Sequence, residues 1–157
     1  MSAKPLAEGI EIRDARTEDV DELLPLMRAY CDFYEANPPD EGLREMATGL
    51  IEEPASGAML IARDEGGGAF GFAAMAWKWS SLNGARIGFL DDLYVTEEAR
   101  GRGIADALIE ACAERCRKRG MPVMEWLTAH DNRRAQAVYD RLGGTSEPFL
   151  EYELRLE

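Results

Sequence analysis

The residues around position 102 have the composition of an anion-binding loop. Gly101 and Gly103 lack the Cβ atom that hinders a positive φ angle, so successive backbone N–H groups can converge on one point. A helix is expected to begin directly afterwards, and its unpaired N-terminal donors and its dipole suit an anion such as a pyrophosphate. Arg100 and Arg102 supply full positive charge beside it. The predicted phosphate contacts are Arg100, Gly101, Arg102, Gly103, Ile104 and Ala105.

Spacing excludes two of the three phosphate-binding loops that contain such glycines. A Walker A loop ends in Gly-Lys-Ser/Thr, whereas Ile104 and Ala105 follow Gly103 here. The dinucleotide fingerprint Gly-x-Gly-x-x-Gly puts Asp106 at its third small position, where a carboxylate would repel a diphosphate. The segment also lies too late in the chain for that fingerprint, with no βαβ unit to open it.

The third loop pattern is Arg-x-x-Gly-x-Ala after a strand that ends in Leu-x-Val, and Arg100, Gly103 and Ala105 fit it without a gap. This segment resembles the acetyl-CoA loop of the GNAT superfamily of N-acetyltransferases. A second segment, residues 132–144, is similar to the same superfamily's Asn-x-x-Ala-x-x-x-Tyr-x-x-x-Gly helix, and it follows in the expected order. The resemblance implies that acetyl-CoA binds here as acetyl donor. It adds Leu93, Val95 and Asn132 to the donor site.

An acidic pair, Asp91 and Asp92, precedes that strand end, and this arrangement resembles the diamine acetyltransferases of the spermidine/spermine type. The resemblance implies acetyl transfer from acetyl-CoA to the primary amine of a small molecule, with a polyamine or diamine as the leading acceptor, by direct attack in a ternary complex. No cysteine adjoins the loop, which argues against a cysteine relay. Two alternatives stay open. One is another acceptor, such as a peptide N-terminus, lysine or an aminoglycoside, and the other is a sensor domain that binds acyl-CoA without turnover.

An amine acetyltransferase needs a base, because an alkylamine with a pKa of about 10.4 arrives protonated at neutral pH. Alternation along the expected strand puts Asp91 in an apolar row with Phe89 and Leu93. Asp92 shares the opposite face with Tyr94. Desolvation in the apolar row would raise the pKa of Asp91 into a useful range. The sequence therefore favours Asp91 as general base and Asp92 as cation-binding partner, although a β-bulge, which the resemblance implies, would shift the register and give the role to Asp92.

Tyr139 stands at the position where the resemblance implies the acid that protonates the leaving thiolate. It also belongs to a helical stripe with Val138 and Leu142, so periodicity by itself predicts a core tyrosine. The match to the motif favours the catalytic role. Asn132 stands at the start of the same helix, as its N-cap, as a contact to the pantetheine arm, or as both.

Composition agrees with one enzyme domain of modest size. The chain has 157 residues, 46% of them hydrophobic, which suits a single domain spanning 1–157. Its formal net charge of −12 argues against nucleic acid as a partner and is compatible with a cationic acceptor. One histidine, and three cysteines without a Cys-x-x-Cys pair, give no support for a metal site. No apolar run reaches the length of a membrane span and the N-terminus lacks the apolar core of a signal peptide, so a cytoplasmic location without membrane contact is predicted.

The pattern of apolar and polar residues predicts the α/β elements that must position these groups. Strands are expected at 9–15, 58–63, 69–79, 85–95, 122–129 and 149–156, and helices at 17–34, 40–51, 102–119 and 132–142. The resemblance implies a single-domain GNAT-like fold, in which about four helices flank a mixed, mostly antiparallel central sheet. It also implies a homodimer. The last expected strand is a candidate edge for partner contact, with apolar residues at alternating positions: Leu150, Tyr152, Leu154 and Leu156.

Overall fold

The chain folds around one five-stranded sheet. The computed structural model describes residues 3–156, and its strands are β1 (Ile10–Asp14), β2 (Gly57–Asp64), β3 (Ala69–Ser80), β4 (Ala85–Val95) and β5 (Met124–Trp126). The strands lie in the order β1-β2-β3-β4-β5, with three antiparallel neighbouring pairs followed by the parallel pair of β4 and β5. The predicted mixed, mostly antiparallel sheet is confirmed.

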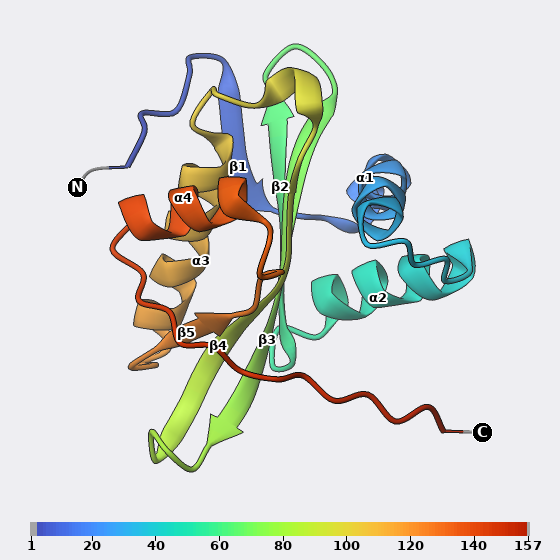
Figure 1. Cartoon of the computed structure of the whole chain (residues 1–157). Coiled ribbons are helices and arrows are strands. Elements are labelled where there is room, and N and C mark those ends of the chain that lie inside the picture. The colour runs from blue at the N-terminus through green and yellow to red at the C-terminus, as the bar shows by residue number, and fades with distance from the viewer. Residues whose placement is uncertain (1–2, 157) are drawn as a thin grey trace.

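Two pairs of helices cover the two faces of the sheet (Figure 1). One face carries α1 (Val20–Phe33), which follows the short 3-10 turn η1 (Thr17–Asp19), and α2 (Asp40–Glu52). The other face carries α3 (Ile104–Lys118) and α4 (Arg133–Arg141), and a second 3-10 turn, η2 (Glu97–Ala99), leads from β4 toward α3. Within residues 3–156 these are the four predicted α-helices.

Alternation along the central strands builds a separate apolar core on each face. In β2, Leu60 packs on the α3 side and Ile61 on the side of α1 and α2, and in β3 Met75 and Phe72 divide in the same way. All four side chains are fully buried. Successive side chains of a strand point to opposite faces, so a continuous apolar run serves both cores. Burying each such side chain contributes roughly 1.5–3 kcal/mol.

A bulge in β4 decides where the acidic pair points. The adjacent β3 residues 74 and 75 pair with Asp92 and Leu90, so Asp91 has no partner in β3. The extra residue breaks the period of two and places Leu90 on the α3 side together with Leu93. The predicted uninterrupted alternation through Asp91 is therefore wrong.

Two predicted element boundaries and one predicted strand are also wrong. The helix expected from 102 begins at Ile104, because Gly103 has a φ of 76° and stands outside the helix. The strand expected over 122–129 is confined to β5. Pro122 lies outside this strand, and as a proline it has no backbone N–H to donate to a neighbouring strand. Residues 149–156 form no strand, since a strand needs a neighbour to pair with and the described chain supplies none there.

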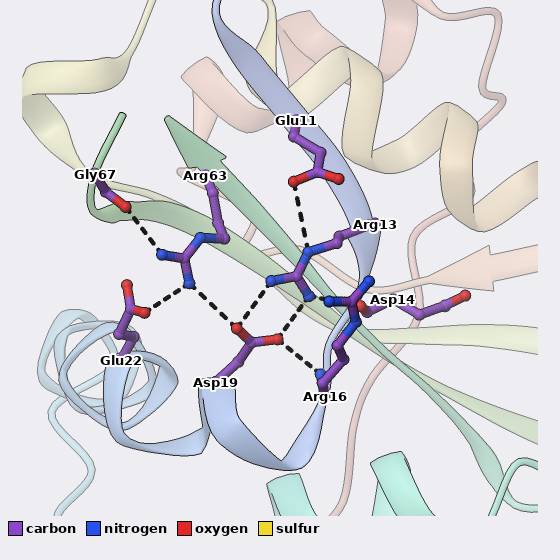
Figure 2. Close-up of polar contacts among 8 residues, drawn as sticks. All are labelled: Glu11, Arg13, Asp14, Arg16, Asp19, Glu22, Arg63 and Gly67. Carbon is purple, nitrogen blue, oxygen red and sulfur yellow. Dashed lines mark hydrogen bonds and ion pairs between the residues drawn. The ribbon is translucent and has the colours of Figure 1, made fainter. Parts of the chain in front are cut away.

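An ion-pair cluster around Asp19 fastens the start of α1 to the sheet (Figure 2). Arg13 of β1 donates to both oxygens of Asp19, over 2.6 and 2.9 Å, and the backbone N–H of Arg16 donates over 2.7 Å. Arg63 of β2 donates to Asp19 over 3.2 Å and to Glu22 over 2.6 Å. These contacts, led by the hydrogen bond from Arg13, hold the pKa of the buried Asp19 carboxyl at about 2.

None of the helices within residues 3–156 combines the length and the apolar composition of a membrane span. The longest, α3, has 15 residues, against the roughly 20 that a span requires. The cytoplasmic location stays a prediction.

Candidate active site

A cavity of about 640 Å³ opens where β4 ends and α3 begins. Its wall combines the last residues of β4, the loop and first turn of α3, one side of α4 and the C-terminal part of α1. The cavity therefore draws on helices from both faces of the sheet. Both sequence motifs contribute to its lining.

The loop before α3 has the backbone conformation that its glycines favour. Gly101 has a φ of 81° and Gly103 a φ of 76°, both in the left-handed region. The backbone N–H groups from Gly101 to Asp106 have no acceptor among the described residues, because the helix begins at Ile104 and its first donors have no preceding turn. Loop and helix dipole together present an array of donors at the cavity wall, which fits a pyrophosphate.

Most of the predicted donor-site residues line the cavity. Arg100 donates from Nε to the carbonyl oxygen of Val95 over 3.2 Å, which holds its side chain beside the strand end. Arg102 is not brought to the cavity: its guanidinium lies 5.3 Å from the centre of the Phe70 ring. The predicted phosphate contact of its side chain has no support in this geometry, while its backbone N–H belongs to the unpaired donors of the loop. The predicted donor residues in the lining are Leu93, Val95, Arg100, Gly101, Gly103, Ile104, Ala105 and Asn132.

The acidic pair divides into an exposed carboxylate, Asp91 on the bulge, and a half-buried one, Asp92. Burial raises the pKa of Asp92 to about 6; the neighbouring Tyr30 hydroxyl opposes the rise, and the charge of Asp91 adds to it. Neither aspartate lines the cavity, but Asp92 adjoins it through Tyr30, which does. A carboxylate with this pKa is mostly ionised at pH 7 and can take up a proton. The geometry therefore favours Asp92, the bulged-strand alternative, over Asp91 as base.

Tyr139 lies half-buried on the α4 wall of the cavity. Its ring meets Trp126 of β5 edge to face, with ring centres 5.3 Å apart. Burial, and then the neighbouring Tyr34, raise the pKa of Tyr139 to about 12, so the phenol stays protonated at neutral pH. This rise is opposite to the shift that would ease full proton transfer to a thiolate, whose thiol has a pKa of about 8.5. A protonated phenol nevertheless donates a hydrogen bond to developing negative charge.

Aromatic residues at the end of α1 and directly after it form the wall on the other side of the cavity. Tyr30 and Tyr34 pack with ring centres 5.1 Å apart, and Phe33 lies beside them. The Tyr30 hydroxyl donates to the Asp91 carbonyl oxygen over 3.3 Å. Aromatic faces next to carboxylates are surroundings that attract an ammonium group.

Asn132 acts as the N-cap of α4. Its side-chain oxygen accepts from the backbone N–H of Ala135 over 3.2 Å. Because Asn132 also lines the cavity, both roles considered for it are compatible with the geometry, and the donor contact stays a prediction.

Asp106 and Arg141 are candidate site residues that the sequence motifs did not reveal. Asp106 does not face a phosphate as a free charge: it is buried, and its oxygens accept from Arg141 Nη2 over 2.6 Å and from Arg141 Nε over 3.3 Å. The backbone N–H of Lys4, which also lines the cavity, donates to the same carboxylate over 2.7 Å. An acid inside an anion site signals that a neutralising partner exists, but the sequence does not identify an arginine 35 residues away.

Within residues 3–156, no three histidine, cysteine, aspartate or glutamate side chains lie close enough together to hold a metal ion. Cys112 and Cys116 are buried free thiols in α3, and Cys31 is a half-buried free thiol in α1. Burial raises the pKa of the Cys112 thiol to about 12, which keeps it unreactive at neutral pH.

Comparison with known protein families supplies the identification. The model of the Acetyltransferase (GNAT) family matches residues 23–144, a span that includes β4, the donor loop and Tyr139. The chain belongs to the acetyltransferase (GNAT) family. GNAT enzymes use acetyl-CoA as acetyl donor, and the array of unpaired N–H groups beside Arg100 fits its pyrophosphate. The predicted enzyme class and acetyl donor are confirmed.

Relatives of this GNAT chain are named for different amine acceptors. The chain is 28% identical over 148 residues to the D-amino-acid N-acetyltransferase of Saccharomyces cerevisiae, covering 94% of this chain and 92% of that protein. It is 27% identical over 149 residues to the thialysine N-epsilon-acetyltransferase of Bos taurus, covering 85% and 83%. A crystal structure described as a probable acetyltransferase has a TM-score of 0.81 at 29% identity, covering 94% of this chain and 98% of that one. The GNAT fold is confirmed, and the acceptor differs among relatives.

Proposed function

We propose that this GNAT enzyme acetylates the primary amine of a small cationic molecule, with polyamines and diamines as the leading class. One observation carries the proposal: half-buried Asp92, with a pKa of about 6, adjoins through Tyr30 the same cavity that the donor loop lines. The exposed Asp91 beside it supplies a second negative charge at the acceptor side. Two carboxylates favour an acceptor that carries more than one ammonium group.

One side chain beside the cavity and one in its wall each carry a proton transfer. When bound, acetyl-CoA supplies the acetyl group as an activated thioester. Asp92 takes the proton of the acceptor ammonium, which frees the nitrogen lone pair to form the C–N bond while the C–S bond breaks. Tyr139 hydrogen-bonds to the departing sulfur and passes a proton to it, and the second proton released by the acylated nitrogen restores the phenol. We therefore assign the base to Asp92, the cation contact to Asp91 and the acid to Tyr139.

Amino acids are the second candidate acceptor class, because two relatives are named for D-amino acids and for thialysine. An amino acid differs from a diamine in carrying a carboxylate. The pair Asp91 and Asp92 would repel that carboxylate, whereas it attracts a second ammonium. Electrostatics therefore favours the diamine.

The experiment that tests the acceptor class measures thiol release from acetyl-CoA with a panel of amines. The decisive pair is 1,4-diaminobutane and 4-aminobutanoate, which share chain length and reacting amine and differ only in the second charged group. We expect kcat/KM to favour the diamine by about tenfold or more, roughly 1.4 kcal/mol. A preference for 4-aminobutanoate, for a D-amino acid or thialysine, for an aminoglycoside or for a peptide N-terminus would overturn the polyamine proposal.

We further propose that the enzyme is a homodimer. The C-terminal residues leave the body of the molecule as an extended trace (Figure 1), and their large apolar side chains are 79–89% exposed. In an extended chain the alternating Leu150, Tyr152, Leu154 and Leu156 share one face. A second copy of the chain offers a cover for this face, and a two-fold arrangement lets both tails be covered in the same way.

A further inference from the structure

Helix α4 carries Tyr139 but is held only loosely by apolar contacts. Among its described residues none is buried, and Val138, Tyr139 and the following Leu142 pack against the α3-side core while remaining partly exposed. The side-chain hydrogen bonds of Gln136 stay within the loop that leads into the helix. Apart from the edge-to-face contact of Tyr139 with Trp126, these apolar contacts are non-directional, so they hold the helix on the surface with little control of its rotation.

A single ion pair joins α4 to the donor side of the cavity. Among the described residues, the side-chain hydrogen bonds between α4 and another helix or strand all run from Arg141 to Asp106, over 2.6 and 3.3 Å. Two bonds from one planar guanidinium to one carboxylate fix both distance and orientation. Asp106 stands in the first turn of α3, with its side chain only 3% exposed, against 25% for Arg141.

We propose that the Asp106–Arg141 pair positions α4 so that Tyr139 faces the donor loop. Arg141 stands two positions after Tyr139, less than one helical turn, and both residues and Asp106 line the cavity. The backbone N–H of Lys4 donates to Asp106 and holds the carboxylate from a third side. Removing one partner of a buried ion pair leaves an uncompensated buried charge, so this pair favours the arrangement of α3 and α4 in which both partners meet. Asp106 and Arg141 are thus positioning residues, and the inference rests on the acid role proposed for Tyr139.

The test begins with steady-state kinetics of Arg141→Gln, Arg141→Lys and Asp106→Asn. We expect Arg141→Gln and Asp106→Asn to lower kcat by about tenfold or more, with the dissociation constant of acetyl-CoA nearly unchanged. Arg141→Lys keeps the charge but not the two-bond geometry, so its kcat should fall between those of wild type and Arg141→Gln. The matched control is Arg117→Gln, which removes an exposed ion pair with Glu110 on the far part of α3 and should keep wild-type kinetics.

A double-mutant cycle with Tyr139→Phe separates positioning from an independent role. If Arg141 acts through Tyr139, Arg141→Gln should lower kcat little further once Tyr139→Phe is present. Losses that multiply would overturn the inference. A weakened acetyl-CoA affinity with unchanged kcat would overturn it too, because Arg141 would then be a phosphate ligand. If Tyr139→Phe alone keeps full turnover, the proposed acid role fails, and the inference fails with it.

Hydrogen exchange in the absence of acetyl-CoA gives a readout that does not depend on turnover. Arg141→Gln should speed exchange of the amides in residues 133–141 while leaving those of residues 108–118 unchanged. Equal protection of α4 in wild type and variant would overturn the positioning role, whatever the kinetics show. Faster exchange throughout both helices would overturn it as well, since the pair would then support the fold in general.

Discussion

The neighbouring carboxylates Asp91 and Asp92 of β4 differ in their surroundings, because Asp91 has no pairing partner in β3. Asp91 occupies the bulge and is exposed, while Asp92 returns to the ladder opposite Ala74 and is half-buried beside Tyr30. Desolvation raises the pKa of both carboxyls, and that of the more buried Asp92 reaches about 6. This difference bears directly on how the rate should depend on pH.

The pH profile should identify the base. Because burial raises the pKa of Asp92 to about 6, its carboxylate form is lost as pH falls through 6, and kcat/KM of wild type should fall there. Asp92→Asn should lose this inflection, and its residual rate should climb with pH as free amine appears. Asp91→Asn should keep the inflection and raise the KM of the amine. If these two profiles are exchanged, the base is Asp91, as the uninterrupted alternation suggested.

Tyr139→Phe should lower turnover without weakening the binding of acetyl-CoA, which distinguishes a role as acid from a role in donor binding. The change keeps the ring and its contact with Trp126 while it deletes the hydroxyl. Turnover should fall by about 10² or somewhat more, toward the lower end of the range for general catalysis, because the phenol with its pKa of about 12 gives a hydrogen bond more readily than a proton. Acetyl-CoA affinity, measured by calorimetry, should be nearly unchanged. Wild-type turnover in the variant would remove Tyr139 from the mechanism.

At the scale of elements, the donor loop contains two glycines that differ in the space available for a side chain. A Cβ on Gly101 would meet no atom within 4 Å, whereas one on Gly103 would lie 2.2 Å from the carbonyl oxygen of Pro5. Saturating acetyl-CoA should raise the melting temperature of wild type by mass action, and Gly101→Val should remove that rise. Gly84→Val is the control, because it adds a side chain at an open, positive-φ turn outside the cavity. A full ligand-induced rise in Gly101→Val would contradict the predicted loop contact.

The Asp19 cluster should make stability depend on pH in acid. The folded-state pKa of about 2 lies below the usual aspartate value of 3.8, so the stabilisation is present above about pH 4 and is lost as pH falls through 2. Asp19→Asn should therefore cost about 2 kcal/mol or more of unfolding free energy at pH 7, and its stability should change less between pH 4 and pH 2. Urea unfolding at several pH values measures both effects. Asp21→Asn, at an exposed pair with Arg44, should cost less than about 1 kcal/mol.

Local patterns in the sequence predicted most elements and most of the residues that line the cavity around the loop, because these depend on neighbouring residues. The helices follow period 3.6 and the loop follows its glycines. What the sequence could not place depends on distant partners. The bulge at Asp91 exists only relative to β3, and the partner of Asp106 comes from another helix. The segment 149–156 alternates like a strand but has no described neighbour to pair with.

At the scale of the whole molecule, the exposed tail predicts the assembly state. Sedimentation equilibrium at micromolar concentration should give about twice the chain mass of 17.4 kDa. Replacing Leu150, Leu154 and Leu156 by serine should shift the mass toward the monomer, because it removes the apolar face that a partner would cover. Replacing Glu151 and Glu153 by glutamine, on the opposite face of the extended tail, is the matched control. A wild-type mass near 17.4 kDa would refute the dimer.

The two apolar cores share no residue, although both rest on the same central strands. Substitutions in well-separated positions without common partners generally add in their effect on stability. Changes in α1 around Tyr30 therefore alter the cavity wall on the α1 side through one core, and the core beneath α3 does not have to repack. A library confined to that stretch of α1 is a natural starting point for directed evolution. A lineage can in this way acquire a new amine acceptor while it inherits its acetyl-CoA loop unaltered.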